Sequence, residues 1–178
     1  MRKVRVSSIL PVSYREELER IVFFNREQGR VKAWLLDSVH RYGIPAIVEE
    51  NGCLRFRVDA FGRLQSIYAF DDVSEPSQLA GVAMFVRDAP DSMVVLHLAV
   101  HEHYTSRGKW SEALVVVRLV GAIRSASERT HGIETLRILY PHEIRLRLHS
   151  ANGVRGAAQA QPSVAASGGS RIAPAPGL

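Results

Sequence analysis

An apolar run that leads into a basic turn and then into a second apolar run constrains this chain more than any other segment. It extends from Ser92 to Val120 and reads SMVVLHLAVHEHYTSRGKWSEALVVVRLV. Its first part predicts a buried strand, Met93 to Val100, and the length and composition of its last part predict a helix from Ser111 to Arg129. A strand, a turn and a helix in this order direct backbone N–H groups at the space above the strand end, which suits an anion.

The N-terminal part predicts one strand and two helices. Alternation between Lys3 and Ile9 favours a short strand. Ser13 and Glu16 have the spacing of a capping box, so a helix is expected from Tyr14 to Gln28. A second helix, from Arg30 to Tyr42, follows Gly29 and is closed by Gly43 and Pro45.

The middle of the chain changes from helical to strand periodicity. Asn51-Gly52 is a strong turn signal between two apolar runs. Further strands are expected at Cys53–Val58, Leu64–Phe70 and Leu79–Val86, ahead of Met93–Val100. Short turns between such strands predict an antiparallel meander.

After the second helical run, Thr135 to Tyr140 predicts one more strand. A strand, a crossover helix and a strand form a βαβ unit, so this strand is expected parallel to Met93–Val100. The segment His142 to Ser150 fits a short helix or an alternating strand equally well. Residues 151–178 carry few large apolar side chains and are expected to be a disordered tail, which leaves one domain over residues 1–150.

Composition excludes several classes of protein. A single cysteine, Cys53, excludes an internal disulfide and a zinc site built on cysteines. No apolar run approaches the roughly 20 residues that span a bilayer, and the N-terminal apolar stretch is too broken for a signal peptide. A cytoplasmic protein without membrane contact is therefore expected. The formal net charge of +5 favours anionic ligands such as phosphates or nucleic acid.

The order strand, two helices, antiparallel meander, helix, strand resembles the GNAT superfamily of acyl-CoA-dependent N-acyltransferases. The segment VVLHLAVHEHYTSRGKWSEAL carries the resemblance, which at the residue level extends from about Leu96 to Leu114. It implies an α/β (α+β) fold with a mixed, mostly antiparallel central sheet and flanking helices. It also implies that a CoA pyrophosphate lies on the turn and that the pantetheine arm fits between two diverging strands.

The resemblance implies a cofactor site for acetyl-CoA or another acyl-CoA as co-substrate. The residues that match it are Leu98, Val100, Arg107, Gly108, Lys109 and Ser111. The family usually has further glycines in this turn, where this chain has Lys109, Trp110, Ser111 and Glu112. The phosphate-binding turn is therefore degenerate. The C-terminal helix and strands of the family are expected to be absent or remodelled, because the chain passes through His142–Ser150 into the expected tail.

Acyl transfer to an amine needs few catalytic groups. A base deprotonates the amine, and an acid or N–H groups help the thiolate to leave. Glu102, just after the strand end, is the candidate base, and Tyr140, at the end of the next strand, is the candidate acid. Alternatively, Glu102 is a solvated loop carboxylate and Tyr140 a half-buried strand-end residue.

His97, His101 and His103 alternate, which places them on one face if the strand extends that far. No carboxylate or further histidine completes a metal site with them, so no metal is expected.

Three functions remain from the sequence. The first is an N-acyltransferase that acts on a small-molecule or protein amine. The second is a catalytically inactive GNAT-like domain that binds a partner, which the missing glycines favour. The third is a nucleic-acid-binding module that uses Arg145 and Arg147, but nucleic acid is the least favoured partner because no pattern of stacking aromatic residues accompanies these arginines. A homodimer is compatible with the sequence, which does not specify an oligomeric state.

Overall fold

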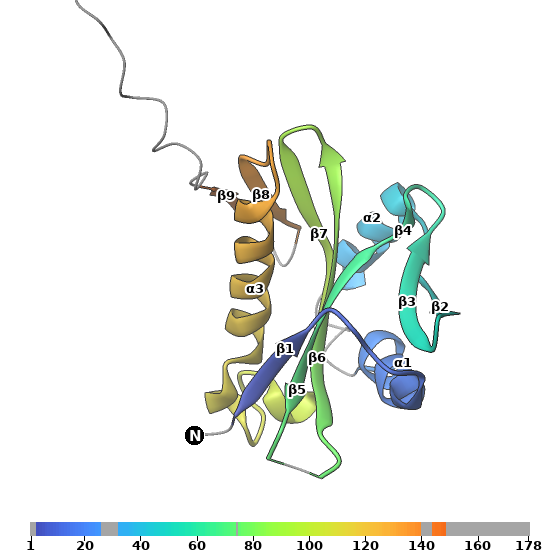
Figure 1. Ribbon diagram of the computed structural model, residues 1–178, viewed down its shortest axis with the longest axis vertical. Helices are drawn as coiled ribbons and strands as arrows, with labels where there is room; N and C mark the ends of the chain where they lie inside the picture. The colour runs from blue at the N-terminus through green and yellow to red at the C-terminus, as the bar shows by residue number, and fades with distance from the viewer. Residues whose placement is uncertain (1–2, 26–31, 74, 140–143, 149–178) are drawn as a thin grey trace, which may run out of the picture.

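A central sheet of six strands organises the computed structural model, which describes residues 3–25, 32–73, 75–139 and 144–148 (Figure 1). Its strands lie in the order β1 (Val4–Ser7), β5 (Gln65–Asp71), β6 (Gln78–Ala89), β7 (Ser92–Val100), β8 (Thr135–Ile138) and β9 (Ile144–Arg147). All neighbours are antiparallel except β7 and β8, which are parallel. The expected mixed, mostly antiparallel α+β fold is confirmed, and so is the parallel pairing of the strands on either side of the crossover helix.

Both faces of the long central strands are covered, which is why these strands are apolar on successive residues. Helix α3 (Val115–Arg129) covers one face, whereas α1 (Arg15–Phe23), α2 (Lys32–Tyr42) and a small second sheet lie on the other (Figure 1). Strand β6 is accordingly buried without interruption from Leu79 to Phe85. Two apolar cores result, one on each side of the sheet.

Helix α3 packs through a stripe of residues four positions apart. Val115, Leu119 and Ile123 are fully buried against the sheet. Gly81 of β6 permits this approach, since a Cβ there would lie 3.0 Å from the Val115 side chain. The helix was expected to begin at Ser111. It begins at Val115 because Leu114 has a left-handed conformation, with φ of 50°, that separates it from the short 3₁₀ turn η4 (Ser111–Ala113).

The start of α1 also differs from the expected capping box. The chain forms a 3₁₀ turn, η1 (Val12–Tyr14), and α1 begins at Arg15 without a side-chain cap. The carboxylate of Glu17 instead accepts a hydrogen bond from the N–H of Leu79, at 2.9 Å, which ties α1 to β6. Helix α1 ends at Phe23, and the expected end at Gln28 lies outside the described residues.

The expected single meander is divided between two sheets. Strands β2 (Ala46–Glu50), β3 (Cys53–Val58) and β4 (Gly62–Arg63) form a separate antiparallel sheet. The hairpin at Asn51-Gly52 is confirmed, and both residues have positive φ, as a type I′ turn requires. The small sheet turns Leu54 and Phe56 into the core that α1 shares with the central sheet, so it acts as a cover for that core.

The C-terminal end of the described chain is a strand. Ile144–Arg147 (β9) pairs antiparallel with β8, which decides between the two alternatives for this segment. Tyr140 and the expected tail, residues 151–178, lie outside the described residues. Among the described helices none is long and apolar enough to cross a membrane.

Candidate functional site

Strand β7 extends beyond its parallel neighbour. The pairing of β7 with β8 ends at Val95 and Ile138, whereas β7 continues to Val100 and stays paired with β6 throughout. No strand in the described part of the chain pairs with the β8-facing edge of β7 after Val95. Among the described residues, the C-terminal half of β7 is therefore an open edge on this side.

The residue after β7 shows which main-chain groups of the strand point toward this open edge. The N–H of His101 donates to the carbonyl of Ala80 in β6 at 2.9 Å. Because N–H and C=O groups alternate in direction along a strand, those of Leu98 and Val100 face away from β6. Side chains from the helical layer reach this edge: Asn25 donates to the carbonyl of Val100 at 2.7 Å. Leu98 belongs to this edge. Its side chain is half-buried and packs against the apolar core on the α3 side of the sheet.

A polar groove runs along α1 beside the end of β7. Two adjoining cavities form it, of about 200 Å³ and 240 Å³, and both are lined by Arg20 and His101. Glu102 lines one cavity with its exposed side chain, and Glu17 lines the other. Burial lowers the pKa of His101, and the charge of the neighbouring His103 lowers it further, so the His101 ring is neutral at pH 7. The groove therefore combines a neutral imidazole with carboxylates and a guanidinium.

The turn after β7 is anchored to the sheet by a buried hydrogen bond. The hydroxyl of Tyr104, in the 3₁₀ turn η3 (Glu102–Tyr104), donates to the carboxylate of Asp71 at 2.6 Å. Tyr104 is 2% exposed and Asp71 fully buried. Trp110 packs its ring 5.1 Å from that of Tyr104. Trp110 thus belongs to the internal packing of the turn.

Gly108 has a packing reason to be glycine. A Cβ at this position would lie 2.4 Å from the carbonyl oxygens of Glu102 and His103. The turn therefore folds back onto η3 more closely than any side chain allows.

Most N–H groups of the turn donate to carbonyls of the turn itself. The bonded donors and acceptors are Tyr104 to His101, Thr105 to Glu102, Gly108 to Thr105, Trp110 to His103 and Ser111 to Gly108. Within the described chain, the N–H groups of Ser106, Arg107 and Lys109 have no hydrogen-bond partner. The side chains of Arg107 and Lys109 are exposed beside them. The capacity of the turn for an anion is therefore confined to these residues, and Ser111 contributes no free N–H.

The three alternating histidines do not converge. Strand β7 ends at Val100, and the chain turns, which places the rings of His101 and His103 4.9 Å apart. His97 lies in an apolar cavity on the α1 side of the sheet. Among the described residues, no group of three or more histidine, cysteine, aspartate or glutamate side chains could hold a metal ion.

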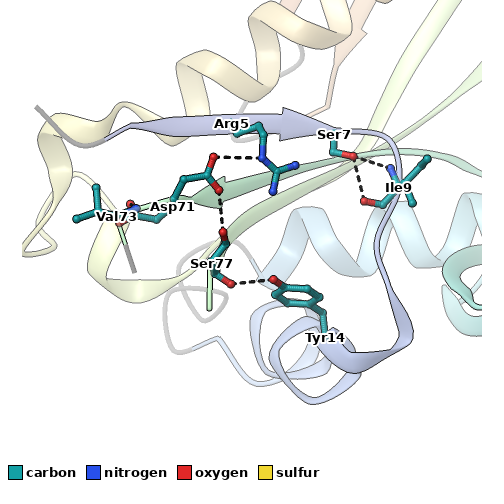
Figure 2. Close-up of polar contacts among 8 residues, drawn as sticks. Arg5, Ser7, Ile9, Tyr14, Asp71, Val73 and Ser77 are labelled. Atoms are coloured by element: carbon teal, nitrogen blue, oxygen red, sulfur yellow. Dashed lines mark hydrogen bonds and ion pairs between the residues drawn. The ribbon is translucent and has the colours of Figure 1, made fainter. Parts of the chain in front are cut away.

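The carboxylate of Asp72, just after β5, is bound to internal partners. Asp72 accepts a hydrogen bond from Ser77 at 2.9 Å and one from Arg5 at 3.1 Å. The bond from Ser77, with the smaller contribution of Arg5, holds the pKa of Asp72 below its usual value. Figure 2 shows Arg5, Ser77 and Tyr14 arranged around this loop, where the Tyr14 hydroxyl also donates to the Ser77 carbonyl at 2.9 Å. The Asp72 carboxylate therefore stabilises this loop, whereas the side chain of Glu75 is exposed.

A hollow larger than the groove cavities lies elsewhere. It has a volume of about 730 Å³, lies beside α3 and the strands β1 and β5, and includes Arg55, Arg63 and Arg129 in its lining. None of the residues that the sequence marked as catalytic or cofactor-binding contributes to it.

The structure brings Leu98, Val100 and Glu102 together at the end of β7 and places Arg107, Gly108 and Lys109 on the following turn. Sequence reasoning missed Arg20 and Asn25, which come from the first helical region and carry no local signal for a site 75 residues away. Comparison of the chain with protein-family models, with curated proteins and with solved structures finds no match.

Proposed function

We propose that this chain is an N-acyltransferase of the GNAT type, which moves an acetyl or other acyl group from acyl-CoA to an amine. The observation that carries the proposal is the open edge of β7 after Val95. An extended ligand with amide groups adds to such an edge through main-chain hydrogen bonds, as a peptide does when it adds a strand to a sheet. The N–H and C=O of Leu98 face the space that the pantetheine arm of acyl-CoA would occupy.

The phosphate end of the co-substrate would lie on the turn. The unpartnered N–H groups of Ser106, Arg107 and Lys109 supply hydrogen-bond donors, and two of these residues add a positive charge. Charge-assisted hydrogen bonds of this kind are about twice as strong as neutral ones. Lys109 also lies with its ammonium 5.6 Å above the Trp110 ring, which holds it on this side of the turn.

The acceptor amine would lie in the polar groove at the end of β7. Its nitrogen attacks the thioester carbonyl, so a C–N bond forms and the C–S bond breaks. The proton leaves the amine for Glu102 through a water molecule, or for His101, whose lowered pKa keeps it neutral and able to accept. The departing thiolate takes a proton from an acid, the role proposed for Tyr140, which lies outside the described residues. Proximity along the β7 edge supplies much of the rate.

One observation favours a second function, that of a GNAT-like domain that binds a partner without catalysis. The N–H groups of Gly108 and Ser111 are bonded inside the turn, and Trp110 fills the space where a phosphate would approach a glycine. Such a turn offers a pyrophosphate fewer N–H donors than a turn with further glycines would. Binding without turnover is the result expected of this second function.

Calorimetric titration of the full chain with acetyl-CoA tests the site, and release of free CoA with a panel of amines tests the chemistry. Arg107→Glu should weaken acetyl-CoA binding at least about tenfold, because a hydrogen bond to a charged group contributes about 1.5–3 kcal/mol. Arg57→Glu is the matched control, because this substitution makes the same change of charge at an exposed strand position of the small sheet. Binding that survives Arg107→Glu, or that Arg57→Glu weakens equally, would place the phosphates elsewhere. Binding without CoA release would support the second function.

A further inference from the structure

A mainly apolar cavity lies between α1, α2 and the central sheet, apart from the polar groove. It has a volume of about 180 Å³ and is walled by apolar side chains that include Val22, Val39, Val58 and Met84. No aspartate, glutamate, lysine or arginine among the described residues lines it. We call it the His97 cavity, because His97 is the titratable group in its wall that belongs to the sheet.

A β-bulge in β7 turns His97 into this cavity. Val95 pairs with Phe85 and His97 pairs with Met84, so Leu96 is an extra residue in the strand. An extra residue shifts the alternation of side chains by one position. Leu96 and His97 consequently both line the cavity, although they are consecutive residues of one strand.

His97 is buried without a hydrogen-bond partner. The residue is 6% exposed, and its Nε2 atom is fully enclosed with no partner in the described chain. Such an atom destabilises the folded protein, and buried polar atoms without partners are rare in native proteins. Burial also lowers the pKa of His97 to about 4, so the ring is neutral at pH 7 and offers one donor and one acceptor.

The cavity is accessible to small molecules. Phe23 and Ile44 contribute to its lining and are 40% and 70% exposed, so its rim reaches the surface. An engineered apolar cavity of about 150 Å³ in another protein holds benzene, which sets the size of a molecule that fits here. A charged ligand would lie among apolar walls without a counter-charge, at a large cost.

We propose that the His97 cavity binds a small uncharged molecule that consists of one apolar ring and one hydroxyl or amino group, with the polar group hydrogen-bonded to Nε2 of His97. The ring fills the apolar space, and the polar group satisfies Nε2 of His97, an enclosed atom that has no partner in the described chain. This binding does not depend on whether the chain transfers acyl groups, because the cavity lies apart from the turn and its lining excludes the groove residues Arg20 and Glu102.

Three probes of similar size test the proposal on the full chain by NMR titration at pH 7. Phenol has the ring and the hydroxyl, toluene has the ring alone, and benzoate has the ring and a charge. Phenol should bind at least about fivefold more tightly than toluene, as one added neutral hydrogen bond implies. Benzoate should neither bind nor displace phenol, because it carries a charge. Shifted amide signals should belong to β7, α1 and α2. Equal binding of phenol and toluene, no binding of phenol, or shifts elsewhere would overturn the proposal.

Two variants locate the contact. His97→Leu should remove the preference for phenol over toluene, and His97→Gln, which keeps a hydrogen-bonding group, should restore part of it. Val39→Phe should block phenol and toluene by filling the cavity. Retention of the phenol preference in folded His97→Leu would refute the assignment of the polar contact. If a variant does not fold, the comparison of the three probes on the unaltered chain still tests whether the cavity binds a ring with a polar group.

Discussion

Acid should destabilise this protein through His97 before most carboxylates are protonated. In the unfolded chain a histidine has a pKa of about 6.5, whereas burial lowers the pKa of His97 in the folded chain to about 4. Between these two values the unfolded state binds a proton that the folded state does not. The free energy of unfolding must therefore fall as the pH falls from about 6.5 to about 4.

The magnitude follows from the size of the shift. Since one pKa unit corresponds to about 1.36 kcal/mol, the step from 6.5 to about 4 contributes about 3 kcal/mol. Only 6% of the residue is exposed, so solvent screens little of this effect. His101 shifts in the same direction for the same first cause, burial, and it contributes to the same window.

Urea denaturation at pH 7, 5.5 and 4.5, followed by tryptophan fluorescence, measures the effect. The unaltered chain should lose more stability across this range than His97→Leu does, and the difference should approach about 3 kcal/mol at the acid end. The comparison removes the contribution of His101, because the variant retains that residue. Parallel loss of stability in both proteins would refute the burial of a neutral, unpartnered imidazole at this position.

Two further predictions concern the turn after β7. Gly108→Ala should destabilise the protein by about 1–3 kcal/mol, as overpacking does, because its Cβ would lie 2.4 Å from two backbone carbonyls. Gly121→Ala, in α3 with open space around the Cβ, should instead stabilise by about 0.5–1 kcal/mol, and denaturation curves in which both variants behave alike would contradict this packing. Tyr104→Phe should cost about 1–3 kcal/mol, since the buried Asp71 loses a donor. Tyr14→Phe, which removes a half-buried bond to a carbonyl, should cost less, and the reverse order in thermal unfolding would count against the anchoring role of Tyr104.

The parts of the fold that could be predicted from the sequence are those that depend on local pattern and chain order. Alternation located the strands, and the crossover rule gave the parallel pairing of β7 with β8. The Asn51-Gly52 hairpin followed from turn chemistry alone. The division of the meander into two sheets was not predictable in this way, because each strand has the same local pattern whichever sheet it joins.

The candidate site was less predictable, because it depends on tertiary register. An uninterrupted strand would place His97, His101 and His103 on one face, but β7 ends at Val100 and the chain turns before His103. The bulge at Leu96, which puts His97 on the same side of the sheet as Leu96, carries no mark in the sequence. The capping box at Ser13 failed for a similar reason, since α1 begins two residues later and Glu17 contacts the sheet.

Gly108 illustrates how packing and function compete to explain one residue. A glycine here agrees with the phosphate-binding turn that the family resemblance implies, but the carbonyls of the preceding turn already exclude a Cβ. Its presence therefore does not discriminate between a phosphate site and a closed turn. A ligand that also engages the edge of β7 would discriminate, because the outward N–H and C=O of Leu98 need partners. Water supplies such partners to any exposed edge, whereas only an extended amide-bearing ligand would bridge this edge and the free N–H groups at Arg107 and Lys109 at the same time. Simultaneous binding to the β7 edge and to the N–H groups of the turn is the property that distinguishes an acyl-CoA site from an anion site or an exposed strand.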